Sequence, residues 1–94
     1  MGNMGNNETF WVQVAGQRVT REMGAQSAAN YAANIIKNDI KNGSPQRVIV
    51  YDLGGAPIDY DPASKTVGYP DDTHNYVEEW HYIAKAMMNA LLQA

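Results

Sequence analysis

Cysteine is absent from this sequence of 94 residues, and no run of apolar residues approaches the ~20 that a membrane-spanning helix requires. The absence of cysteine excludes disulfide scaffolds, zinc ribbons and thiol nucleophiles. Basic residues are also few. Seven Lys and Arg against ten Asp and Glu give a formal charge of −3, without a basic cluster that could displace counterions from nucleic acid. We therefore expect neither a membrane partner nor a nucleic-acid partner held by a basic face.

The length suits one domain, because a second core would need roughly twice as much chain. An aliphatic and aromatic content of 45% is typical of globular proteins. The first residues are rich in Gly and Asn and have neither the basic nor the apolar region of a signal peptide. We expect a flexible arm at 1–8, a single domain at 9–94 and a cytoplasmic location.

An alternation of apolar and polar residues predicts a β-hairpin at the start of the domain. Apolar residues occupy every second position over 9–15, and the alternation resumes over 18–23. Gly16 between the two runs can supply the positive φ of a tight reversal. Phe10, Val12 and Val14 share one face of the first strand, and Trp11 lies on the other face. There Trp11 either contacts a partner or packs beneath a helix that covers that side of the sheet.

The next segment has helical spacing and clear end signals. Ser27 is a plausible N-cap, and alanines and isoleucines recur on one face after it. Asn42-Gly43 followed by Pro45 predicts the end of this helix, because glycine favours the C′ position and proline cannot continue a helix.

Two further strands follow. The continuous apolar run at 47–51 indicates a central strand covered on both faces. Ile58 and Tyr60 predict a short return strand, and Pro57 places it at an edge because proline cannot donate to a neighbouring strand. The segment 61–72 is expected to be an irregular connector.

Helical spacing returns at 73–93, so the sequence predicts an α+β fold. This fold has a four-stranded, mainly antiparallel sheet in ββαββ order and a long C-terminal helix. The apolar arc of the last helix is wider than the ~100° that packing on one sheet requires. The residues expected to face the sheet are Tyr76, Trp80, Ile83, Met87, Ala90 and Leu91.

A second apolar seam borders that face, formed by Val77, Ala84, Met88 and Leu92, with His81 beside it. One sheet cannot cover both sets of residues, and an uncovered seam of this size is near the limit that monomers tolerate. The seam therefore predicts a homodimer through the C-terminal helices, unless the hairpin or the segment 61–72 folds over it.

The same helix carries a candidate metal site. Glu78 and His81 have the i, i+3 spacing that carboxylate-bridged metal sites use, and His74 lies one turn earlier. The chain has no second such motif, so a metal site would need both copies of a dimer. A solvated helix face explains these residues more simply. No metal or other cofactor is therefore expected.

The sequence contains no complete calcium loop, catalytic motif or nucleotide-binding motif. Asp59 and Asp61 have the start of calcium-loop spacing, but no closing Glu follows and Pro62 interrupts the pattern. The sequence contains no nucleophile elbow, P-loop or dinucleotide fingerprint. We expect a protein that is not an enzyme.

The hairpin, the alanine-rich helix that ends at Gly43-Ser44-Pro45, and the Val48-Ile49 strand give the segment 9–60 a family resemblance. The segment resembles small ββαββ domains of uncharacterised bacterial and phage proteins and is similar to a small type I-F anti-CRISPR protein. The resemblance implies a small non-catalytic protein that binds another macromolecule. It assigns no functional residue.

These observations predict a non-catalytic protein–protein interaction module, such as a phage or mobile-element inhibitor of a host defence complex. The predicted interface residues are Trp11, Val77, His81, Ala84, Met88 and Leu92. One alternative is a metal-binding protein or enzyme that uses Glu78 and His81 across a dimer. Another is a nucleic-acid-binding accessory protein, with the cations Arg18, Lys37, Lys41 and Arg47.

Overall fold

The computed structural model describes residues 9–52, 57–68 and 77–93, apart from the side chains of residues 77 and 78. The predicted arm at 1–8 lies outside the described residues. In chain order the elements are β1 (Phe10–Val14), β2 (Gln17–Arg18), α1 (Ala25–Lys41), β3 (Val48–Asp52), β4 (Pro57–Asp61), β5 (Thr66–Gly68) and α2 (Val77–Gln93).

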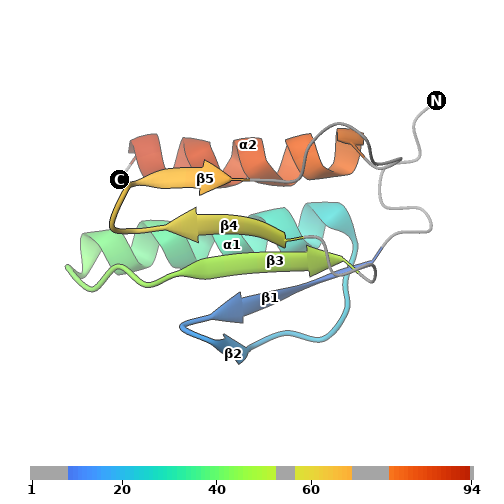
Figure 1. Ribbon diagram of the computed structural model, residues 1–94, viewed down its shortest axis with the longest axis horizontal. Coiled ribbons are helices and arrows are strands. Elements are labelled where there is room, and N and C mark those ends of the chain that lie inside the picture. The colour runs from blue at the N-terminus through green and yellow to red at the C-terminus, as the bar shows by residue number, and fades with distance from the viewer. Residues whose placement is uncertain (1–8, 53–56, 69–76, 94) are drawn as a thin grey trace.

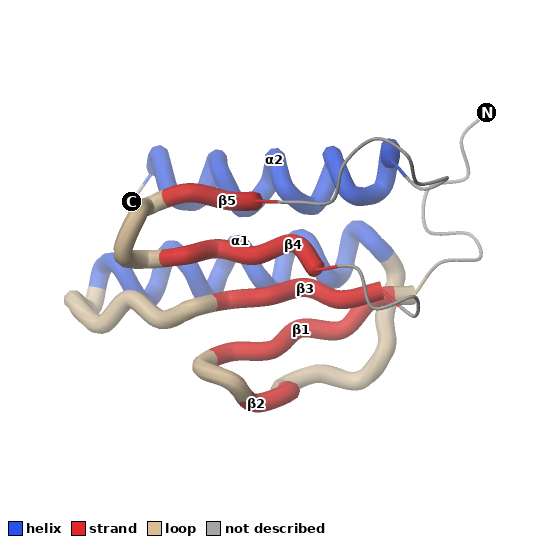
Figure 2. The backbone as a smooth tube through the Cα atoms, viewed as in Figure 1, coloured by secondary structure: helices blue, strands red, loops and turns tan. Residues whose placement is uncertain are grey.

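The strands form one antiparallel sheet in the order β2-β1-β3-β4-β5. Both helices pack on the same face of this sheet, and Figure 1 and Figure 2 view it from its helix-free side. The predicted α+β class, the antiparallel sheet and the C-terminal helix are confirmed. The first five elements follow the predicted ββαββ order, but the sheet has five strands instead of four, because β5 adds a strand before α2.

The fifth strand lies inside the segment predicted to be an irregular connector. A tight turn after β4 brings it back: the Lys65 amide donates to the Asp61 carbonyl at 2.8 Å, and Lys65 has a φ of 58°. The Asp61 carboxylate also accepts a bond from the Ala63 amide at 2.9 Å. Asp61 and Pro62 are thus turn residues. Since β5 pairs with β4, the prediction that β4 is an edge strand is also wrong; Pro57 is tolerated as its first residue, which pairs only with β3.

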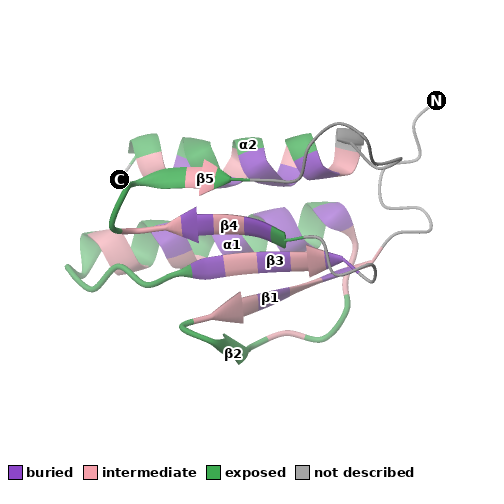
Figure 3. Ribbon diagram, viewed as in Figure 1, coloured by how far each residue is buried: buried purple, intermediate pink, exposed green. Residues whose placement is uncertain are grey.

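The central strand β3 is covered on one face only. Val48 and Val50 are buried beneath the helices. Ile49 and Tyr51, which alternate with them along the strand, are half-buried on the helix-free face. Figure 3 shows this alternation along the strand. The expectation of cover on both faces fails because the second helix packs beside the first instead of behind the sheet.

The hairpin turns at Ala15 and Gly16, whose φ angles of 52° and 85° suit a tight reversal. Its second strand is much shorter than the predicted 18–23. The reason is local: the Thr20 hydroxyl accepts the Val12 amide bond at 3.0 Å, in place of a backbone carbonyl. The chain rejoins the sheet only at Met23, which exchanges two backbone bonds of 2.7 Å with Phe10.

The first helix ends where predicted and begins earlier than predicted. Gly24 is its N-cap, so Ser27 lies exposed in the first turn. At the other end Gly43 adopts a φ of 77°, and its amide donates to the Ile40 carbonyl at 3.0 Å. Ser44 adds a bond to Asp39 at 2.9 Å, which satisfies a further helix-end carbonyl.

The core lies between the sheet and the two helices. Its buried residues are Phe10, Val12, Ala25, Ala28, Ala29, Ala32, Ile36, Val48, Val50, Ile58, Tyr60, Trp80, Ile83, Ala84, Met87 and Ala90. The helix α2 packs against α1 as well as against β4 and β5. Two neighbours therefore account for the wide apolar arc of α2, and the small alanines of α1 allow the helices to approach closely.

Candidate functional site

Three side chains form a stacked ladder on the helix-free face of the sheet. Trp11 and Tyr51 pair across β1 and β3, and their rings stack with centroids 4.5 Å apart and an interplanar angle of 23°. The Arg18 guanidinium lies 4.6 Å from the centroid of the Trp11 ring. Because β1 lies between β2 and β3, Trp11 is flanked by the other two residues. We call Arg18, Trp11 and Tyr51 the aromatic ladder.

An ion pair joins β4 to the residue that precedes β3. Arg47 donates two bonds to the Asp59 carboxylate, at 2.9 and 2.6 Å. These hydrogen bonds and the attraction of the Asp59 charge raise the pKa of Arg47. The charges of Arg47 and Asp59 compensate each other, whereas the ladder itself carries the charge of Arg18.

A second surface follows the outer side of α2. Leu92 is 82% exposed and Met88 is 37% exposed, and both are large apolar side chains. Three adjoining hollows of about 560, 330 and 180 Å³ surround them. The residues that line these hollows are Ile40, Pro45, Tyr60, Pro62, Lys65, Thr66, Val67, His81, Ala84, Lys85, Met88, Leu91 and Leu92. We call this surface the α2 track.

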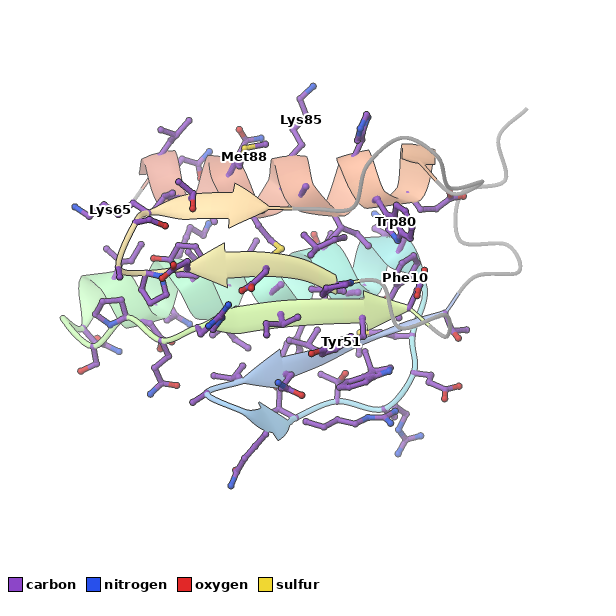
Figure 4. The ribbon with its side chains drawn as sticks, viewed as in Figure 1. Phe10, Tyr51, Lys65, Trp80, Lys85 and Met88 are labelled. Carbon is purple, nitrogen blue, oxygen red and sulfur yellow. The ribbon has the colours of Figure 1, made fainter. Side chains whose placement is uncertain are left out.

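Figure 4 shows how the α2 track is built. Met88 and Lys85 project from the side of α2 that faces away from α1, and Lys65 lies at the end of the molecule where β5 begins. The turn between β4 and β5 thus lies at the C-terminal end of α2, because β5 packs beside that helix. The track consequently combines residues from α1, from β4, β5 and the turn between them, and from α2.

The structure divides the predicted interface residues between these two surfaces. Trp11 belongs to the aromatic ladder, and it does not lie beneath α2, because α2 covers the other face of the sheet. Met88, Leu92 and the exposed His81 lie on the α2 track. Ala84 is only 1% exposed, so the predicted seam is broken at this position. The side chain of Val77 lies outside the described residues.

Of the three candidate metal ligands, the structure describes only the His81 side chain. His74 and the Glu78 side chain lie outside the described residues, and His81 is exposed on α2. Within the described part of the chain, no three His, Asp or Glu side chains are close enough together to hold a metal ion. The candidate site stays a prediction. Elemental analysis of protein purified without chelator, with Glu78→Ala as the comparison, tests it.

The other candidate groups have structural roles. Asp59 binds Arg47, and Asp61 accepts the Ala63 amide in the turn, so neither carboxylate points to a calcium loop. The four cations proposed to bind nucleic acid are also separated. Arg18 and Arg47 flank the sheet, whereas Lys37 and Lys41 are exposed on α1.

Sequence reasoning missed Tyr51, Lys65 and Leu91 as surface residues. Tyr51 could have been found from the strand pairing, because it lies directly opposite Trp11 in the register of β1 and β3. Lys65 and Leu91 meet only through tertiary packing of the β4–β5 turn beside α2.

Among the described residues, neither helix combines the length and hydropathy needed to cross a membrane. No protein-family model matches the sequence, and no curated protein or solved structure was found to be similar to it. The surface chemistry therefore carries the functional conclusion.

Proposed function

We propose that this chain is a small non-catalytic protein that acts by binding another protein through the helix-free face of its sheet. The observation that supports this proposal is the aromatic ladder. Tryptophan, tyrosine and arginine are the residue types most enriched at the energetic centres of protein interfaces. Here one residue of each type lies on the sheet face that both helices leave open.

The stacking also favours binding. Trp11 lies between Arg18 and Tyr51, and the Arg18 Nε donates to the Thr20 carbonyl at 2.8 Å, which restrains that side chain further. A partner that binds restrained side chains pays a smaller entropy cost for ordering them. The stacking covers ring faces that single-stranded nucleic acid would need for its bases. A protein partner thus fits the ladder better than a nucleic acid.

Two finer proposals accompany this function. The resemblance to small phage and bacterial domains suggests a cytoplasmic inhibitor of a host defence complex, which would bind one of its subunits. A homodimer through α2 would use Met88 and Leu92. Light scattering at high protein concentration tests the dimer separately from the ladder.

Affinity capture from host-cell lysate tests the proposed function. Tagged wild-type protein is compared with Trp11→Thr, which removes the centre of the ladder and keeps a residue that suits a strand. Tyr31→Ala is the matched control, because Tyr31 is an aromatic residue on α1 that is 39% exposed. We expect a partner that is retained by wild type and Tyr31→Ala and lost with Trp11→Thr.

Circular dichroism establishes that each variant is folded before capture. A partner retained equally by all three proteins would contradict the proposed role of the ladder. Mass spectrometry of the retained protein then shows whether it belongs to a defence complex, and calorimetry with the purified partner measures the loss of affinity.

A further inference from the structure

The α2 track has a charge that differs from that of the whole chain. The chain carries a formal charge of −3. Among the described residues that line the track, Lys65 and Lys85 are cationic, and none is a carboxylate. An apolar surface that carries two lysines and, among its described lining residues, no carboxylate is complementary to an apolar segment that carries acidic residues.

The shape of the track also limits the occupant. Adjacent hollows share lining residues: Leu91 and Leu92 border the two larger ones, and Met88 borders the smallest and its neighbour. They therefore follow one another in a path along α2, with Met88 between the smallest hollow and its neighbour. From His81 to Leu92 the path is about 17 Å long, or roughly three helical turns. A helix that lies in such a path would bury apolar residues spaced at i, i+3 or i+4, and i+7.

We propose that the α2 track binds an amphipathic helix of another protein, whose apolar face is flanked by aspartate or glutamate. Leu92 and Met88 would supply the apolar contacts, and Lys65 and Lys85 would attract the acidic flanks. This surface is formed by other elements than the aromatic ladder, so the inference does not depend on binding through the ladder. It competes with the homodimer through α2, which would use the same Met88 and Leu92.

A second copy of the chain is the other candidate occupant, because the track of one copy would then meet the track of the other. The described lining residues of a second track include no carboxylate that would pair with Lys65 and Lys85. An acidic helix supplies both the apolar contacts and the opposite charges.

A designed peptide provides the test. The probe is a 16-residue helix of about four turns, long enough to span the path, with leucines on one face and glutamates beside them. A second peptide keeps the leucines and replaces every glutamate by lysine. The protein carries ¹³C-methyl methionine, so Met88 reports from the track, while the half-buried Met23, which pairs with Phe10 of β1, reports from the opposite edge of the sheet.

We expect the acidic peptide to shift the Met88 signal and leave the Met23 signal unchanged. The double variant Lys65→Glu/Lys85→Glu should bind the acidic peptide about tenfold more weakly, because each exposed charge pair contributes a few-fold in affinity. Lys37→Glu is the matched control, since it reverses an exposed lysine on α1, and it should bind like the wild type.

Three results would overturn the inference. The first is no Met88 shift at peptide concentrations up to about 1 mM, the weak end of measurable affinity. The second is equal binding of the acidic and basic peptides, which would remove the charge argument. The third is a dimer in light scattering that the peptide cannot dissociate and that Leu92→Lys converts to a monomer, which would assign the track to a second copy.

Discussion

Removal of the stacked rings in the aromatic ladder should lower the free energy of unfolding, and the loss can be divided between the ring stack and the contact with Arg18. Replacement of Trp11 and Tyr51 by valine keeps the β-branched character that strands favour and removes the rings. The centroid distance of 4.5 Å lies in the range of stabilising aromatic pairs. Such pairs contribute about 0.5–1.5 kcal/mol beyond the area that they bury.

The expected losses of stability differ between the Trp11 and Tyr51 variants because the two side chains make different contacts. Trp11→Val removes the ring stack and also the contact with Arg18, for which exposed cation–π pairs suggest about 0.5–1 kcal/mol. The free energy of unfolding should therefore fall by about 1–2.5 kcal/mol in Trp11→Val. It should fall by about 0.5–1.5 kcal/mol in Tyr51→Val, which loses the stack alone.

Urea unfolding followed by far-ultraviolet circular dichroism measures these differences, since a fluorescence signal would change when tryptophan is removed. The double variant gives the coupling between Trp11 and Tyr51, which we expect to be about 0.5–1.5 kcal/mol. Tyr31→Ala combined with Tyr51→Val is the internal control: Tyr31 lies on α1, which packs on the other face of the sheet, so the two effects should add within about 0.5 kcal/mol. A Trp11–Tyr51 coupling below about 0.3 kcal/mol would show that the stack does not form in solution.

Three further predictions concern the core. Ile83→Ala, at a fully buried position of α2, should lower the free energy of unfolding by about 2–5 kcal/mol. Leu92→Ala, at an 82% exposed position, should change it by less than about 0.5 kcal/mol in the same urea titration. Equal losses would contradict the packing of α2. Ala32→Leu should cost about 1–3 kcal/mol because the core around this buried alanine has no room for a larger side chain, and an unchanged thermal midpoint would argue against close packing there. Burial raises the pKa of the Tyr60 phenol above its usual 10.0, with nearby carboxylates adding to the effect. The unfolded chain therefore ionises first as pH rises, stability falls above about pH 10, and Tyr60→Phe should lose less stability there than the wild type; identical alkaline unfolding curves would refute this.

Local signals predicted those parts of the fold that local interactions determine. The end of α1 follows from Gly43, whose positive φ allows the chain to reverse, and β1 follows from its alternation. The strand β5 could not be predicted in the same way. It has only three residues after a turn that contains Pro62, and it forms because β4 offers a partner for it.

The position of α2 decides which of the predicted seam residues reach the surface. The width of its apolar arc predicts a sheet contact plus a dimer seam, because a sequence does not reveal that α1 lies beside it. The dimer stays a prediction. This neighbour buries Ala84 and leaves Met88 and Leu92 at the surface. The outward direction of Trp11 was predictable from alternation, whereas its contact with Tyr51 depends on strand order and register.

Among the described residues, the sheet ends in very short strands on both sides, with two residues in β2 and three in β5. A strand at the border of a sheet exposes unpaired backbone N–H and C=O groups, and a long one invites a strand from another molecule to continue the sheet. Borders of this length present few such groups. Recognition by this protein should therefore depend on side chains instead of strand addition, and the folded chain should resist the fibrillar stacking to which proteins with long open borders are prone.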